Sequence, residues 1–169
     1  ARRRDLLEMV GRSADRCGGR SSGPLAFSPP MRHGRAAAGM GRVIMTRVEE
    51  GSEVFVHASD IQLLADEPVA FILDWSPTIV LVSGPPVYRD DRRSVRQAAL
   101  RRIRRIAGTV DACLIDHHLL RCREGIRWLD ELRRETAGKV MCAADFMGKR
   151  RLFLEARRSE LYRRFPVPE

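Results

Sequence analysis

The chain has 169 residues, of which 44% are apolar and only 6% aromatic, enough for the core of one small globular domain. No apolar run reaches the roughly 20 residues that cross a bilayer, and the arginine-rich start lacks the apolar segment of a secretion signal. These features exclude a membrane-spanning protein and favour a soluble, cytoplasmic one. The formal net charge is +9, and only Lys139 and Lys149 of the 31 basic residues are lysine. Arginine suits phosphate contacts, but a GC-rich coding bias produces the same enrichment, and we favour the bias.

The first 24 residues predict little regular structure. A short helical piece at residues 6–10 leads into residues 17–24, whose Gly, Ser and Pro content is typical of a loop. A β-hairpin is then predicted, with strands at 43–48 and 53–58 and a turn at 49–52 in which Gly51 supplies a positive φ.

From residue 63 onward, helical and strand patterns alternate. The spacing of apolar residues predicts helices at 63–75, 92–107, 123–136 and 151–164, and strands at 78–82, 112–115 and 139–142. This alternation predicts an α/β layered fold in one domain spanning residues 1–169. The four cysteines show no C-x-x-C spacing, so we expect buried, reduced thiols rather than disulfides or a zinc knuckle.

Chemically distinctive residues follow the ends of the predicted strands, where α/β sheets bind ligands. For Asp60, a role in a functional site is favoured over capping of the helix that follows. For Asp145, the carboxylate of a helix start is favoured over a role in a site. For the double proline, a rigid turn and a site loop are equally compatible with the sequence. The four segments are Ser59-Asp60, Gly84-Pro85-Pro86, Asp116-His117-His118 and Asp145.

The histidines divide into two groups. His57 lies inside a predicted strand and is expected to be a core or face residue rather than a ligand. His117 and His118 follow the strand at 112–115, and His33 lies in an upstream loop. Because neighbouring residues of a strand point to opposite sides, one of His117 and His118 is expected to bind a metal while the other packs or supports it.

Six short motifs together resemble a known family. FSPPMRHG, HASDIQ, SGPPVY, LIDHHLLR, AADFMGK and LEARRSELY are similar, in this order, to the signatures of a mainly archaeal branch of the metallo-β-lactamase superfamily. The resemblance implies an αββα sandwich, of which this chain would form the second half. It also implies that His33 is a metal ligand, that Asp60 is the catalytic carboxylate bridging two zinc ions, and that His117 or His118 is the last-motif ligand. Ser59 and Asp116 would support the ligands or face the substrate.

The superfamily's main signature, H-x-H-x-D-H, is absent from the 169 residues. That motif carries most ligands of both metals and the aspartate expected to act on the attacking water. We therefore expect a partial zinc site in the C-terminal part of a longer domain, although divergence is the alternative. The leading hypothesis is a metal-dependent hydrolase of ester, amide or phosphodiester bonds, in small-molecule or phosphodiester substrates, that is inactive as this half. An uncovered sheet face would also favour homo-oligomers.

The alternative from another class is a nucleic-acid-associated basic protein or nuclease-related fragment without its own active metal site. In the predicted helix at 92–107, apolar residues form one stripe and seven arginines occupy the rest, with no acid on the helix to balance them. Arg96, Arg101 and Arg105 are the candidate phosphate contacts, and binding would be weak and independent of sequence. Because no aromatic residues interleave to stack bases, a solvated helix face is the simpler interpretation.

Overall fold

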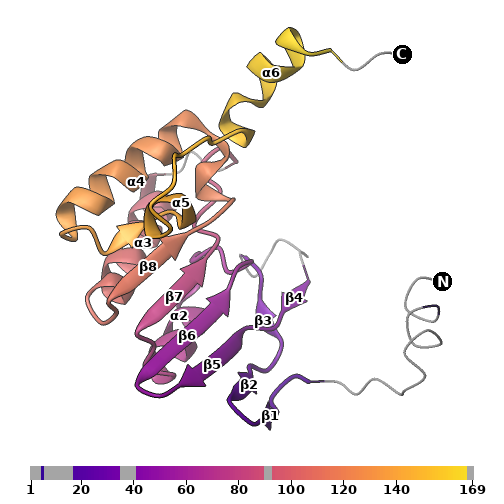
Figure 1. Ribbon diagram of the computed structural model, residues 1–169, viewed down its shortest axis with the longest axis vertical. Coiled ribbons are helices and arrows are strands. Elements are labelled where there is room, and N and C mark those ends of the chain that lie inside the picture. Colours follow the sequence, from indigo (N-terminus) through magenta and orange to yellow (C-terminus); the bar gives the residue numbers. More distant parts are fainter. Residues whose placement is uncertain (1–4, 6–16, 35–40, 90–92, 167–169) are drawn as a thin grey trace.

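A seven-stranded mixed sheet forms the centre of the computed structural model, which describes residues 5, 17–34, 41–89 and 93–166 (Figure 1). The strand order is β1-β2-β5-β6-β7-β8-β9; the pairs as far as β5–β6 are antiparallel and those from β6–β7 onward are parallel. The strands are β1 Ser21–Ser22, β2 Leu25–Phe27, β5 Thr46–Glu50, β6 Glu53–Ala58, β7 Ile79–Val82, β8 Ala112–Ile115 and β9 Val140–Met141. A separate two-stranded sheet pairs β3 (Met31–Arg32) with β4 (Arg42–Val43).

The parallel strands are joined by the three longest helices of the described residues. These are α2 (Asp66–Asp74), α3 (Arg93–Ala107) and α4 (Arg123–Glu135). Helices α2 and α3 pack together behind the sheet in the view of Figure 1. The remaining helical segments are short: η2 (Leu119–Arg121), α5 (Ala143–Phe146), η3 (Glu155–Arg157) and α6 (Arg158–Arg164). The mixed α/β class predicted from the sequence is confirmed.

The hydrophobic core lies on one face of the sheet. Alternate residues of β6 and β7, Val56 and Val80 among them, are fully buried and belong to the same cluster as Ile72 of α2 and Ile103 of α3. This is the packing expected when strand side chains alternate between two faces and helices cover one of them.

Over β5, β6 and β7 the other face of the sheet is largely apolar and half-exposed, whereas on β8 both Ala112 and Leu114 are buried. Phe55 of β6 is paired in register with Val48 of β5 and Ile79 of β7, and Leu81, which pairs with His57, lies two residues further along β7 on the same face. The side chains of Val48, Phe55, Ile79 and Leu81 keep intermediate exposure, and none belongs to the main hydrophobic cluster. Among the described residues, no helix layer covers this part of the sheet, which faces the viewer in Figure 1.

Most predicted elements are present, but several boundaries differ for backbone reasons. The hairpin of β5 and β6 turns at Gly51, which has a φ of 60°. The predicted strand at 43–48 is divided, because Val43 pairs with Met31 in the smaller sheet. The helix predicted from residue 63 starts only at Asp66, because Leu63 has a φ of 58°. Such a φ is incompatible with a right-handed helix.

The C-terminal helix also begins later than predicted. Phe153 has a φ of 45°, so the helical backbone starts at η3 and α6 rather than at Arg151. Residues 17–24 are not simply a loop, because they contain β1, which pairs with β2. The helical piece predicted at residues 6–10 lies outside the described residues.

No helix in the described part of the chain is both long and apolar enough to cross a membrane. All four cysteines are free thiols. Cys113 and Cys142 are buried as predicted, whereas Cys17 is exposed and Cys122 is half-buried.

Candidate metal centre

Three parallel strands end side by side and bring their following loops to one edge of the sheet. Ala58 of β6, Val82 of β7 and Ile115 of β8 are aligned in register. Asp60 therefore lies near the residues that follow Ile115. His33 reaches the same edge from the end of β3, where its backbone carbonyl accepts a hydrogen bond of 3.4 Å from the backbone N–H of Gln62.

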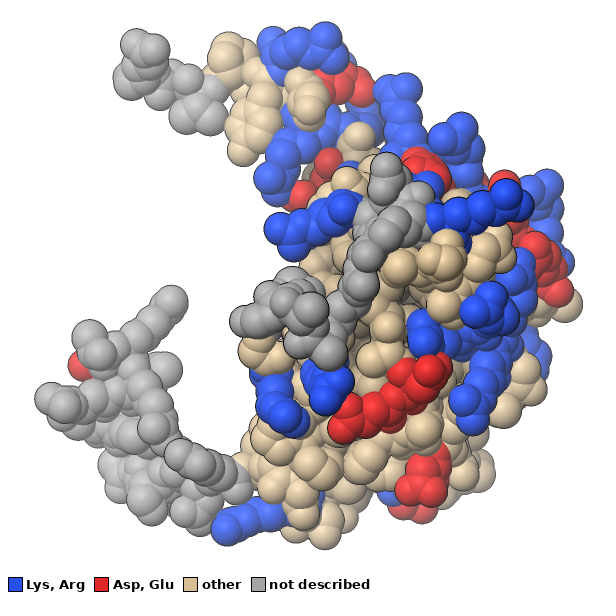
Figure 2. All heavy atoms as spheres, turned by 180° about the vertical axis from the view of Figure 1, so that it is seen from behind, with Lys and Arg blue, Asp and Glu red and all other residues tan. Residues whose placement is uncertain are grey.

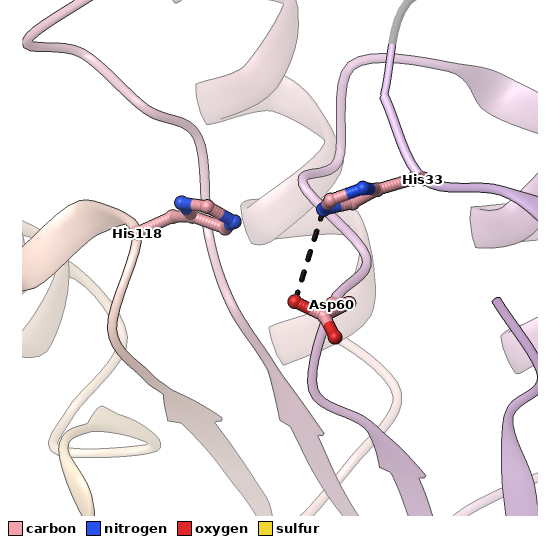
Figure 3. A group of neighbouring side chains, drawn as sticks. All are labelled: His33, Asp60 and His118. Atoms are coloured by element: carbon pink, nitrogen blue, oxygen red, sulfur yellow. Dashed lines mark ion pairs between the residues drawn. The ribbon is translucent and has the colours of Figure 1, made fainter. Parts of the chain in front are cut away.

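His33, Asp60 and His118 converge as the sequence predicts. One ligand atom from each residue lies within 4.8 Å of the others. Nε2 of His33 is 3.7 Å from Oδ1 of Asp60, the ion pair drawn in Figure 3, and the His118 ring points into the same space. Two imidazole nitrogens and a carboxylate oxygen are ligands that zinc and similar divalent ions accept.

Gln62 completes this cluster and was not identified from the sequence. Its side chain is buried, and its amide nitrogen lies 3.3 Å from Nε2 of His33 and 3.4 Å from Nε2 of His118. The only signal in the sequence is a glutamine between two apolar residues, Ile61 and Leu63, which the structure shows to be buried.

His118 is held from its other ring nitrogen. The hydroxyl of Tyr88 lies 3.4 Å from its Nδ1, and Arg121 donates a 3.0 Å hydrogen bond to that hydroxyl. Burial, together with the nearby His117, Arg121 and His33, lowers the pKa of His118 to about 4. The imidazole is therefore neutral at pH 7, which is the form that binds metals.

His117 lies on the same side as His118, contrary to the expectation that the two rings would diverge. Their ring centroids are 4.4 Å apart. The strand ends at Ile115, and His118 already has helical backbone angles, φ −69° and ψ −44°, so the alternation of a strand no longer applies. The expected divergence of the rings is wrong because it extended the strand geometry into a turn, whereas the expected division of roles between the two histidines stays a prediction.

His117 makes contacts typical of a histidine aimed by a carboxylate. Its Nδ1 lies 3.1 Å from Oδ2 of Asp116, which also accepts a 3.2 Å hydrogen bond from the hydroxyl of Ser59. Its Nε2 lies 3.5 Å from Oδ1 of Asp60. A carboxylate at one ring nitrogen fixes the proton there and directs the other nitrogen outward. Asp60 thus lies between His33 and His117.

The Gly84-Pro85-Pro86 loop supports the turn that carries His118. Gly84 has a φ of 72°, and a Cβ at this position would come within 2.9 Å of Cγ2 of Ile115 and of Cβ of Leu119. The backbone N–H of Leu119 donates to the carbonyl of Ser83 at 3.1 Å. The loop packs beneath the site and contributes none of the clustered ligand atoms.

Asp145 and His57 lie apart from the cluster, as the sequence suggested. Asp145 accepts hydrogen bonds from the backbone N–H of Cys142 at 3.1 Å and from Arg151 at 2.6 Å, so it caps α5 and forms an ion pair. His57 is exposed and lies beside Phe55, with 6.4 Å between ring centroids.

The arginines of α3 are less isolated than the sequence predicts, because acids on other elements approach them. Arg96 pairs with Glu124 and donates to the carbonyl of Val87 at 2.9 Å. Arg102 and Arg104 pair with acids of α2 and α4, at 2.7 and 2.9 Å. Arg101 and Arg105 are exposed. Figure 2, seen from the side opposite to Figure 1, shows acidic side chains among the basic ones.

Comparison with known proteins finds relatives that are described as UPF0282 proteins. A UPF0282 protein of Methanosarcina mazei is 45% identical over 99% of this chain and 55% of its own length. UPF0282 proteins of Pyrococcus horikoshii and Methanopyrus kandleri are each 36% identical, over 82% and 81% of this chain and 45% and 48% of their own lengths. The chain spans about half the length of the curated relatives it matches. No family model and no solved structure matches it.

Proposed function

We propose that this chain, which belongs to the UPF0282 family, forms the metal-binding second half of a hydrolase with the metallo-β-lactamase fold. In the complete protein, the reaction would be attack of an activated water on an ester, amide or phosphodiester bond. The observation that carries the proposal is the convergence of His33, Asp60 and His118 within 4.8 Å at the carboxyl ends of parallel strands.

The chemistry of the donor set supports a metal ion. Oδ1 of Asp60 faces Nε2 of His33 at 3.7 Å and Nε2 of His117 at 3.5 Å. When these imidazoles are neutral and their Nε2 atoms unprotonated, lone pairs and a negative oxygen point at one another. Such an arrangement is stabilised when a cation lies between them.

Each residue would have a distinct role in this site. His33 and His118 would bind the ion through Nε2, and Tyr88 would hold the His118 ring in place from Nδ1. Asp60 lies between the two sides of the site, which suits a carboxylate shared by two ions. Asp116, oriented by Ser59, would keep His117 aimed at Asp60. A bound zinc ion supplies Lewis acidity and lowers the pKa of its water to about 7.

The open sheet face supports the sandwich fold. In an αββα sandwich, the inner face of each sheet is apolar and packs on the other sheet. The half-exposed side chains of Val48, Phe55, Ile79 and Leu81 have this character. UPF0282 relatives are nearly twice as long as their match to this chain. We place the second sheet and the remaining ligands in that other half of those proteins.

Zinc titration by calorimetry tests the proposal. The 169-residue chain should bind at most one zinc ion, weakly, because it holds only part of a ligand set. His33→Ala, Asp60→Asn and His118→Ala should each weaken binding by at least about tenfold, because even the loss of a supporting residue typically lowers metal affinity about 10–100-fold. His57→Ala is the matched control, since it removes an exposed histidine of the same sheet. Equal zinc affinity in all four variants would refute the metal centre, and two tightly bound ions per chain would refute the half-site.

A further inference from the structure

We propose that the side-chain amide of Gln62 is a ligand of the same metal ion, through its oxygen Oε1. The inference rests on the proposed function and adds a fourth protein ligand to His33, Asp60 and His118. It assigns the cluster two nitrogen and two oxygen donors.

The position of Gln62 is the first observation. Its side chain is 1% exposed, although glutamine is rarely buried to this extent. Its amide end lies between the two imidazoles, in contact with Nε2 of both rings. Burial of an amide costs free energy unless its polar atoms are satisfied, so a glutamine here requires a compensating interaction.

The spacing of the four donor groups is the second observation. With zinc–ligand bonds of about 2.0–2.1 Å, the corners of a tetrahedral site are about 3.3–3.5 Å apart. The amide end of Gln62 lies 3.3 Å from Nε2 of His33 and 3.4 Å from Nε2 of His118, and Oδ1 of Asp60 lies 3.7 Å from Nε2 of His33. The amide end is therefore spaced from the two imidazoles as one corner of a tetrahedral site is from two others.

The hydrogen bonds of the amide give the third observation. Without an ion, the NH₂ group lies within hydrogen-bonding distance of Nε2 of both imidazoles, while Oε1 is buried and has no hydrogen-bond partner in the described residues. A turn of 180° about the last side-chain bond exchanges the oxygen and the nitrogen. That turn breaks no hydrogen bond to the oxygen. It also brings the oxygen beside the ion once the imidazole lone pairs bind metal.

An amide oxygen changes which ions the site accepts. Carboxylate and carbonyl oxygens suit harder cations such as Mn²⁺, whereas imidazole suits zinc and its neighbours in the first transition series. A site with two imidazoles, one carboxylate and one amide should therefore bind Mn²⁺ measurably as well as Zn²⁺. The contribution of Gln62 should be larger for Mn²⁺.

Calorimetric titrations with ZnCl₂ and MnCl₂ test the inference in the intact chain. Gln62→Leu, which keeps the side-chain volume, should lower the affinity at least tenfold for Zn²⁺ and further for Mn²⁺. Gln62→Glu, which keeps the oxygen, should bind both ions at least as tightly as the parent. Gln97→Leu changes the exposed glutamine of α3 and is the matched control. Circular dichroism checks that each variant is folded.

The outcomes separate the two proposals. If the parent binds zinc and His118→Ala weakens it, but Gln62→Leu does not, the site stands and the role of Gln62 is refuted. If the parent does not bind zinc, both proposals fail. A crystal structure of the zinc-loaded chain gives the direct readout, with Oε1 of Gln62 within about 2.3 Å of the ion. An amide nitrogen still facing the two imidazoles in that crystal would overturn the inference.

Discussion

Replacing Gly84 by alanine should destabilise the fold and disturb the metal site at the same time. Gly84 follows β7 and has a φ of 72°, a conformation that side chains disfavour. An added methyl group would meet Cγ2 of Ile115 and Cβ of Leu119, both at 2.9 Å. Both neighbours are fully buried, so they have little space to move away. Leu119 directly follows His118, and its displacement would shift that imidazole.

The size of the effect follows from two separate costs. The left-handed backbone costs alanine about 1–2 kcal/mol relative to glycine. Forcing a methyl group into a filled core costs about 1–3 kcal/mol more. Together they amount to roughly 2–5 kcal/mol, a large part of the 5–15 kcal/mol that typically stabilises a domain. Gly51→Ala separates the two costs, since Gly51 has a φ of 60° but no atom within 4 Å of the added carbon.

Urea unfolding followed by circular dichroism measures the difference. Gly51→Ala should lose about 1–2 kcal/mol, and Gly84→Ala should lose a further 1–3 kcal/mol or so. Zinc affinity should fall in Gly84→Ala and stay unchanged in Gly51→Ala. If the two variants lose the same free energy of unfolding, the close packing beneath His118 is not what requires a glycine at position 84.

Three further results are expected. Although burial alone would raise it, the pKa of Asp145 lies below its usual value because of hydrogen bonds from Arg151 and Cys142. The ionised carboxylate therefore contributes fully to the free energy of unfolding above the pH range where a free aspartate titrates, and this contribution is lost as the pH falls through the lowered pKa. Asp145→Asn should lower the free energy of unfolding by roughly 2 kcal/mol at pH 7. It should also make the loss of stability at acid pH less steep. The chain should self-associate in sedimentation experiments, and threonine at both Phe55 and Leu81 should reduce this. Binding to nucleic acid should be weak and salt-dependent.

Each expectation has a control and an opposing outcome. Glu155→Gln removes an acid that is also paired with an arginine, but the pair is exposed and screened by solvent, so the pH dependence should change less. Equal acid sensitivity of the parent and Asp145→Asn would contradict the linkage. His57→Thr tests whether the loss of self-association is specific to apolar side chains, and a monomeric parent at all concentrations would count against an open apolar face. Glutamine at Arg101 and Arg105 should flatten the salt slope by nearly one unit per contact. An unchanged slope would identify an ordinary solvated helix face.

The sequence predicted the elements best where hydrophobic pattern alone determines structure. The strand at Ala112–Ile115 has the predicted bounds because all four residues are buried, and α3 ends at Ala107 as its periodicity indicates. The starts of α2 and of the C-terminal helix were placed too early, because Leu63 and Phe153 adopt positive φ without any glycine to signal it. Such conformations are imposed by tertiary packing and leave no local pattern.

The sequence predicts the site residues whose side chains can bind a metal and which directly follow a strand. It does not predict the residues that only tertiary packing brings to the site. His33, Asp60 and His118 combine ligand chemistry with positions just after strands, and they converge. Gln62 has no such pattern, because a single polar residue in an apolar run is indistinguishable from a surface position until its burial is known. The sequence also did not predict the ion pairs of α3, because the acidic partners of Arg96 and Arg102 come from other elements.

The cluster keeps its geometry within this half of the proposed fold because local hydrogen bonds, rather than the ligands, position its loops. The hydroxyl of Ser83 donates to the carbonyl of Ile61 at 2.9 Å, and the carbonyl of Ser83 accepts from Leu119. Both bonds are buried and tie the loops after β6, β7 and β8 to one another. Loops fixed in this way hold Asp60 and His118 near each other before any ion binds. Metal affinity should therefore depend on core packing as well as on the donor atoms.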